Sequence, residues 1–229
     1  PTQRIKPATV NRELACLKKL FYYFKRNRRI LTDNPVSDVK MLTEERIFHV
    51  LTHEQESAYL DECTQPLYDI AVLMLETGMR NDEVYTMRFE HVHLPGRYYH
   101  NLKGKTPSAR RRITLTDRAI SVITRRFEEV EGEHIFPGGK AGDSAKPLVK
   151  ANNAHYGALR RCQLPHFRLY DLRHTFATRF VEAGGDLRTL ADILGHTDLR
   201  MVMVYSHPTD PNKRNQIKLL EEYNRERRP

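Results

Sequence analysis

Two short segments in the last third of the chain are the most informative about its fold and function: residues 170–178, YDLRHTFAT, and residues 194–207, LGHTDLRMVMVYSH. The leucine and phenylalanine of the first segment stand four residues apart, which predicts a helix with one apolar face. Tyr170 and Arg173 share another face near the start of that helix, where the helix dipole and free N–H groups favour a bound phosphate. The same pattern also fits an ordinary basic amphipathic helix packed on a core.

The second segment places a histidine and a tyrosine nine residues apart. His196 follows Gly195, which is expected to end a helix, and Tyr205 follows a short apolar stretch. Because the turn of a helix-turn-helix motif often needs glycine, residues 187–205 could also form a DNA-reading motif. The histidine and the tyrosine therefore indicate a catalytic site only in company with other reactive residues.

Two segments earlier in the chain contain further reactive residues, each next to residues that are typical of turns. Arg80 lies in TGMRNDEV, just after Gly78, which is expected to end a buried helix. Glu83 lies one helical turn later, where its carboxylate could brace the guanidinium. Lys105 lies in a loop between two predicted strands, where it could reach a groove as a point charge or proton donor. Taken singly, each residue also fits a solvated surface position.

The composition favours a polyanionic partner. The 229 residues carry a formal net charge of +9, and clustered cations gain affinity by releasing the counterions of phosphates. A basic protein without such a partner would have the same composition. Three scattered cysteines provide no zinc site and suit a reducing cytoplasm. No apolar run approaches the roughly 20 residues of a membrane helix, and no signal peptide is visible.

Periodicity and turn residues predict a mainly helical fold with one small antiparallel sheet. Strands over residues 97–102 and 110–115 are expected to form a hairpin. The polar stretch 37–49 is expected to be a linker, and the first residue, Pro1, suggests a piece of a longer protein. Helices are predicted over residues 9–26, 53–62, 66–77, 117–130, 152–162, 171–183, 187–194, 198–206 and 212–226.

Together these segments resemble the tyrosine recombinase family, most closely its phage integrase branch. The family's catalytic residues occur here in the family's order: Arg80, Lys105, Arg173, His196 and Tyr205. The resemblance spans about residues 8–207 and implies the recombinase catalytic fold (α+β) over residues 46–229. Residues 1–45 resemble the end of the family's helical core-binding domain with its linker.

One position departs from the family pattern. The family usually has a histidine three residues before the second arginine, where this chain has Tyr170. A histidine exchanges protons near neutral pH, whereas an unperturbed tyrosine, with a pKa of about 10, mostly does not. Tyr170 is therefore predicted to donate a hydrogen bond to the phosphate rather than to act as a base.

The resemblance implies a mechanism for DNA strand transfer. Arg80, Arg173 and His196 would bind the nonbridging phosphate oxygens. Lys105 would protonate the leaving 5′ oxygen, with Lys103 in the same loop as the alternative. Tyr205 would attack phosphorus and form a 3′-phosphotyrosyl link. No metal, ATP or other cofactor is expected. The implied partner is double-stranded DNA of the cytoplasmic nucleoid, with a homotetramer on two DNA sites.

Three other functions remain open at this point. A type IB topoisomerase would use the same chemistry on a single duplex, although the LGHTD and YSH segments are more similar to integrases. A basic regulator with a helix-turn-helix at residues 187–205 would bind DNA without cleaving it. A metal-dependent nuclease would need an acidic cluster with suitable spacing, and none is apparent in the sequence.

Overall fold

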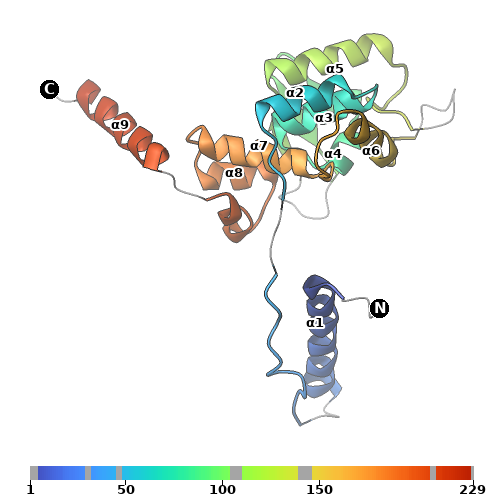
Figure 1. Cartoon of the computed structure of the whole chain (residues 1–229), viewed down its shortest axis with the longest axis vertical. Helices are drawn as coiled ribbons and strands as arrows, with labels where there is room; N and C mark the ends of the chain where they lie inside the picture. Colours follow the sequence, from blue (N-terminus) through green and yellow to red (C-terminus); the bar gives the residue numbers. More distant parts are fainter. Residues whose placement is uncertain are drawn as a thin grey trace. The chain divides into compact units, whose positions relative to one another are not determined.

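The chain forms two compact units, Pro1–Ile47 and Phe48–Pro229. Figure 1 shows the helices and strands of both units, coloured from the N-terminus to the C-terminus. The computed structural model describes residues 5–28, 32–44, 48–103, 110–138, 146–206 and 210–227. Within those ranges no helix combines the length and the apolar character that crossing a membrane requires.

The smaller unit is one helix with an extended segment beside it. Helix α1 (Pro7–Tyr23) continues into a π-helical turn, Phe24–Arg28. The side chain of Asn11 donates to the carbonyl oxygen of Leu42 (2.8 Å) and to Glu44 Oε1 (2.6 Å). Its own oxygen accepts the N–H of Leu42 (2.7 Å). These bonds fasten the returning segment to the helix.

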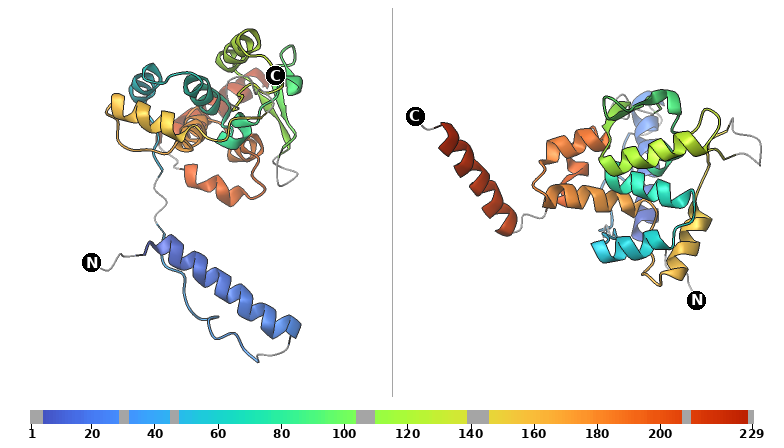
Figure 2. Two further views of the ribbon diagram at one scale, coloured as in Figure 1. Left: turned by 90° about the vertical axis from the view of Figure 1, so that its right-hand side faces the viewer. Right: turned by 90° about the horizontal axis from the view of Figure 1, so that it is seen from above.

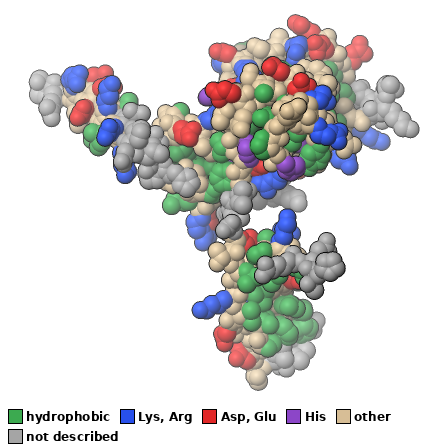
Figure 3. All heavy atoms as spheres, viewed as in Figure 1, with side chains coloured by type: hydrophobic (Ala, Val, Ile, Leu, Met, Phe, Trp, Pro, Cys, Tyr) green, Lys and Arg blue, Asp and Glu red, His purple; other side chains and the backbone are tan. Residues whose placement is uncertain are grey.

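Apolar side chains stay exposed on the smaller unit, and Figure 3 shows hydrophobic atoms gathered on its visible face. A single amphipathic helix cannot bury its own apolar stripe. The exposed large hydrophobic residues of α1 and the following segment are Leu17, Leu20, Tyr22, Tyr23, Val39, Met41 and Leu42.

The larger unit is built around helix α3 (Leu67–Thr77), in which almost every residue is buried. A helix that is apolar on all sides belongs in a protein interior. Helices α5 (Asp117–Glu129) and α7 (Asp171–Glu182) pack against it. Besides two 3₁₀ turns near residue 200, the other helical elements in the described part of this unit are α2 (His53–Asp61), α4 (Asn81–Tyr85), η2 (Phe89–His91), α6 (Asn152–Arg161), α8 (Leu187–Leu194) and α9 (Asp210–Arg227).

A three-stranded antiparallel sheet lies at one side of the helices (Figure 2). It consists of β1 (Val92–His93), β2 (Tyr98–Asn101) and β3 (Arg111–Thr114), and Asn101 pairs with Arg111. The predicted hairpin and the mainly helical fold are thus confirmed. Strand β1 was not predicted, because two residues carry no alternating pattern.

The predicted helix over residues 198–206 is wrong. The segment instead forms two 3₁₀ turns, η4 (Leu199–Met201) and η5 (Met203–Tyr205). Val202 and Tyr205 are its buried residues, and their three-residue spacing matches the 3₁₀ period. They complete a second core with α7 and α8, and this core holds Tyr205 against α7.

Candidate active site

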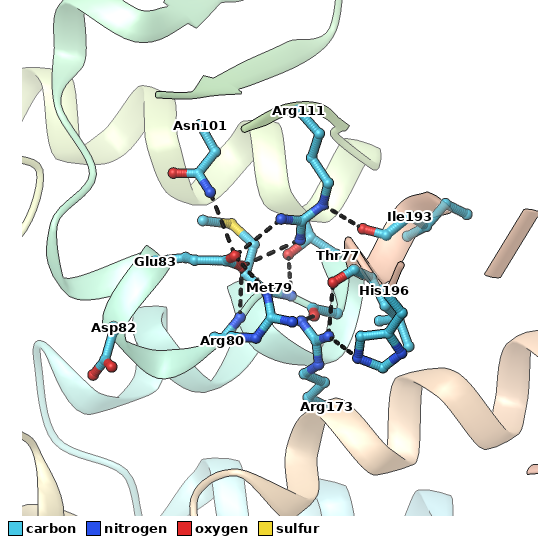
Figure 4. Close-up of polar contacts among 12 residues, drawn as sticks. Thr77, Met79, Arg80, Asp82, Glu83, Asn101, Arg111, Arg173, Ile193 and His196 are labelled. Carbon is cyan, nitrogen blue, oxygen red and sulfur yellow. Dashed lines mark hydrogen bonds and ion pairs between the residues drawn. The ribbon is translucent and has the colours of Figure 1, made fainter. Parts of the chain in front are cut away.

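Arg173 is the centre of the site. It is 1% exposed and donates to the carbonyl oxygens of Gly78 and Leu194, each at 2.8 Å (Figure 4). These carbonyls lie at the carboxyl ends of α3 and α8, where unpaired C=O groups carry partial negative charge. Burial lowers the pKa of Arg173 to about 10, so the guanidinium stays charged at neutral pH.

Two glycines make this arrangement possible. Gly78 and Gly195 end α3 and α8 with φ of 65° and 67°, a left-handed conformation that glycine adopts without strain. A Cβ on Gly78 would lie 2.5 Å from a ring carbon of Phe176. The prediction that both glycines end helices is confirmed, and each helix end directs a carbonyl at Arg173.

Arg80 enters the site from the turn between α3 and α4. Its Nη1 and its backbone N–H donate to the two carboxylate oxygens of Glu83, each at 2.9 Å. The prediction that Glu83 braces Arg80 is confirmed. The Arg80 side chain remains 29% exposed, whereas that of Glu83 is 7% exposed. Part of the guanidinium is therefore accessible from solvent.

Arg111 is a site residue that the sequence prediction missed. It starts strand β3 and donates to both oxygens of Glu83, at 2.9 and 3.2 Å. Its Nε also donates to the carbonyl oxygen of Ile193 (2.6 Å) at the end of α8 (Figure 4). Burial favours a raised pKa for Glu83, but the hydrogen bonds and charge of Arg111 outweigh it and lower the pKa. The carboxylate thus stays ionised between two arginines.

His196 follows Gly195 and points at Arg173, whose Nη2 lies 2.9 Å from His196 Nε2. A guanidinium only donates, so Nε2 accepts and the neutral ring carries its proton on Nδ1. Burial, followed by the charges of Arg173 and Arg80, lowers the pKa of His196 to about 4. Among the described residues, the buried Nδ1 has no hydrogen-bond partner. An unpaired buried donor suits an acceptor that arrives with a ligand.

Tyr205 lies at the end of η5 and is 5% exposed. Its hydroxyl lies 2.5 Å from Nδ1 of His174, and Phe48 packs edge-on against its ring. Burial raises the pKa of Tyr205 to about 12, although the charge of Arg173 acts in the opposite direction. The hydroxyl is therefore protonated in the free protein and would need a proton acceptor to become a nucleophile.

Tyr170 directly precedes α7 and lies beside the same groups. The guanidinium carbon of Arg173 lies 5.9 Å from the centre of its ring, and His174 contacts the ring edge-on at 5.2 Å. Contacts and charge interactions connect five of the six predicted site residues: Arg80, Tyr170, Arg173, His196 and Tyr205. Lys105 lies outside the described residues, and Lys103 is exposed at the end of a described segment.

The comparisons with known proteins agree on one family. The sequence profile of the Phage integrase family matches residues 49–211. The putative integrase of Pseudomonas phage Pf1 is 30% identical over 210 residues, which cover 89% of this chain and 58% of that protein. The integrase of Escherichia phage 186 is 29% identical over 225 residues, which cover 95% and 61%. The chain thus spans about three fifths of these relatives.

Solved structures share the fold. The Tn1549 transposon integrase in complex with circular intermediate DNA superposes with a TM-score of 0.77 at 21% identity, covering 94% of this chain and 81% of that one. A lambda integrase dimer bound to a COC′ core site superposes with a TM-score of 0.71 at 16% identity, covering 88% and 59%. At these identities the likeness establishes the fold alone.

Proposed function

The chain belongs to the phage integrase family of tyrosine recombinases, and from this premise we propose that it cleaves and rejoins DNA through Tyr205. The observation that carries the proposal is the buried cation Arg173, which contacts His196 and whose charge acts to lower the pKa of Tyr205. A fixed positive charge next to a nucleophile is what an attack on a phosphodiester requires, because charge builds up on the phosphate oxygens.

Each group has a role in the proposed cleavage. The accessible part of Arg80 and the unpaired Nδ1–H of His196 donate to the nonbridging oxygens, and the buried charge of Arg173 stabilises the negative charge that builds up on them. The oxygen of Tyr205 bonds to phosphorus while the bond to the 5′ oxygen breaks. Lys105 protonates that leaving oxygen, as the family resemblance implies. The phosphotyrosyl link keeps the energy of the phosphodiester, so a 5′ hydroxyl can reverse the step without ATP.

The proposed partner is double-stranded DNA, which suits the net charge of +9. Two DNA sites held by four protomers would give the exchange of strands that recombination requires. A helix-turn-helix regulator is disfavoured, because the segment that would supply its second helix forms the 3₁₀ turns η4 and η5. Residues 1–45 are proposed to be the end of a core-binding domain, in which other helices of that domain would cover the exposed apolar residues of α1.

A covalent-trapping experiment tests the proposal. Duplexes with randomised central bases are first selected by retention on the Tyr205→Phe variant, then nicked so that cleavage releases a short strand. Wild-type protein should form an adduct that survives denaturing gel electrophoresis, and Tyr205→Phe should bind without forming one. Tyr59→Phe is the matched control, because Tyr59 is also buried and also bonded to a histidine. An adduct with Tyr205→Phe would contradict the assignment.

A further inference from the structure

His174 contacts the hydroxyl of Tyr205, the proposed nucleophile. Its Nδ1 lies 2.5 Å from the Tyr205 hydroxyl, and the two residues come from different elements, α7 and η5. Tyr170 lies one helical turn before His174. The α7 segment thus places an imidazole in hydrogen-bond contact with the Tyr205 hydroxyl.

The surroundings hold the His174 ring in one orientation. Phe48 stacks on it with ring centres 4.7 Å apart, and Tyr170 contacts it edge-on. These two rings fix the plane of the imidazole, so that Nδ1 faces the phenol of Tyr205. Only 17% of the side chain is exposed, which limits the access of water to its nitrogens.

The other ring nitrogen faces a carboxylate. His174 Nε2 lies 4.0 Å from Oδ1 of Asp171, one turn earlier on α7. Asp171 is itself held by Arg168, whose backbone N–H and Nη2 each donate to it at 2.8 Å. A carboxylate on this side favours the tautomer with its proton on Nε2, which leaves the lone pair of Nδ1 directed at Tyr205. Nucleophile, base and carboxylate thus follow one another in the order of a hydrolase triad, with the carboxylate acting on the imidazole through its charge at 4.0 Å.

We propose that His174 is the general base that activates Tyr205 and that Asp171 is its positioning residue. This inference rests on the proposed function and deepens it. As the tyrosine oxygen bonds to phosphorus, its proton passes to His174 Nδ1. The bond from phosphorus to the 5′ oxygen breaks, and that oxygen takes its proton from the proposed general acid, Lys105. On rejoining, the imidazolium returns its proton to the tyrosine oxygen.

The charges around His174 keep its ring neutral in the free protein. Burial is the largest effect and lowers the pKa of His174 to about 4, Asp171 acts to raise it, and Arg168 and Arg173 act to lower it. The ring is therefore neutral and able to accept a proton above about pH 5. An incoming phosphate adds negative charge close by, which favours the imidazolium as it forms.

Single-turnover adduct formation with His174→Ala and His174→Gln tests the proposal. Loss of a general base should slow the step by about a hundredfold or more. The wild-type rate should be nearly flat between pH 5.5 and 7.5, whereas the variant rates should rise about tenfold per pH unit. Added imidazole should restore part of the activity of His174→Ala. His155→Gln is the matched control and should keep the wild-type rate and pH profile.

A second measurement uses the unaltered protein, so it does not depend on a variant that folds. The ¹⁵N chemical shifts of His174 should report a neutral ring protonated on Nε2. A ring protonated on Nδ1, or variants that react as fast as wild type with its pH profile, would overturn the inference. If wild-type protein itself forms no adduct, the proposed function fails instead, so the two failures are distinguishable.

Discussion

Two buried tyrosine–histidine pairs in the larger unit have the same hydrogen bond in different surroundings. In the core, the Tyr59 hydroxyl lies 2.7 Å from Nδ1 of His155, and at the site the Tyr205 hydroxyl lies 2.5 Å from Nδ1 of His174. Both tyrosines are almost fully buried. The bond alone therefore does not distinguish a structural tyrosine from a nucleophile.

The surroundings make the difference. The second nitrogen of His155 bonds to the carbonyl oxygen of Phe167 (2.8 Å), whereas that of His174 faces the carboxylate of Asp171. Burial raises the pKa of Tyr59 far above its usual value, and neighbouring Cys63 adds to the rise. At the site the charge of Arg173 partly offsets the same effect on Tyr205. A nearby cation and an oriented base thus separate the reactive pair from the structural one.

Removing the cation should have the largest effect. Arg173→Ala is expected to slow adduct formation by about three orders of magnitude, because loss of a single group that stabilises the developing negative charge costs about 10²–10³-fold. It also leaves the carbonyls of Gly78 and Leu194 unpaired, which should lower the melting temperature. Arg126→Ala is the control, since Arg126 is a buried arginine that bonds the carbonyl of Ile135 instead. Equal rates for the two variants would contradict the role of Arg173.

The second prediction concerns Lys105, the proposed general acid. The structural Tyr59–His155 pair has no counterpart to it, because no reaction takes place there. Lys105→Ala should slow cleavage by about a hundredfold or more, the usual contribution of a general acid. A substrate with sulfur at the bridging 5′ position should restore the rate, because a thiolate leaves without a proton. Lys103→Ala is the control on the same loop. Rescue confined to the Lys103 variant would move the general acid to that residue.

Tyr170 should have a smaller effect. If its hydroxyl donates to the phosphate, Tyr170→Phe should slow cleavage about tenfold or less, because two arginines share the charge. Tyr170→His should be tolerated and add a pH dependence near 6 to 7. Rates across pH 5.5–8.5 measure both effects. A Phe variant as fast as wild type would make Tyr170 a packing residue only.

The smallest predicted effect is on stability against acid. The pKa of His174 is lowered to about 4 in the folded state, below the unfolded value of 6.5. Its stabilising contribution is therefore present above pH 6.5 and lost as the pH falls towards 4, and it amounts to at most about 3 kcal/mol. Burial also lowers the pKa of His155. Chemical unfolding at pH 7 and pH 5 should show a smaller difference for His174→Gln and for His155→Gln than for wild type.

Local patterns predicted two glycine helix ends, whereas the candidate site residues were predicted from the resemblance to the family. Gly78 and Gly195 indicate their left-handed turns by residue type alone. His196 follows Gly195 directly, and Arg80 stands two residues after Gly78. The 3₁₀ turns before Tyr205 were missed because their apolar residues also fit a helical period. Strand β1 was missed because a strand of two residues is too short to show an alternating pattern of apolar and polar residues.

Contacts between distant segments could not be predicted in this way. His174 and Tyr205 stand 31 residues apart and meet only because α7, α8 and η5 share a core. Arg111 is one of three consecutive arginines, and strand register decides which of them reaches Glu83. Because His174 follows Arg173 in the sequence, its position near the site could have been predicted. The direction of its side chain towards Tyr205 depends on the fold.

The most direct test is to identify the residue that becomes linked to DNA. Wild-type adduct formed on the nicked duplex is digested with trypsin and nuclease, and the modified peptide is sequenced by mass spectrometry. We expect a nucleotide attached through its 3′ phosphate to Tyr205. A modification on Tyr170, on any other residue, or on none in a protein that binds the duplex would contradict it.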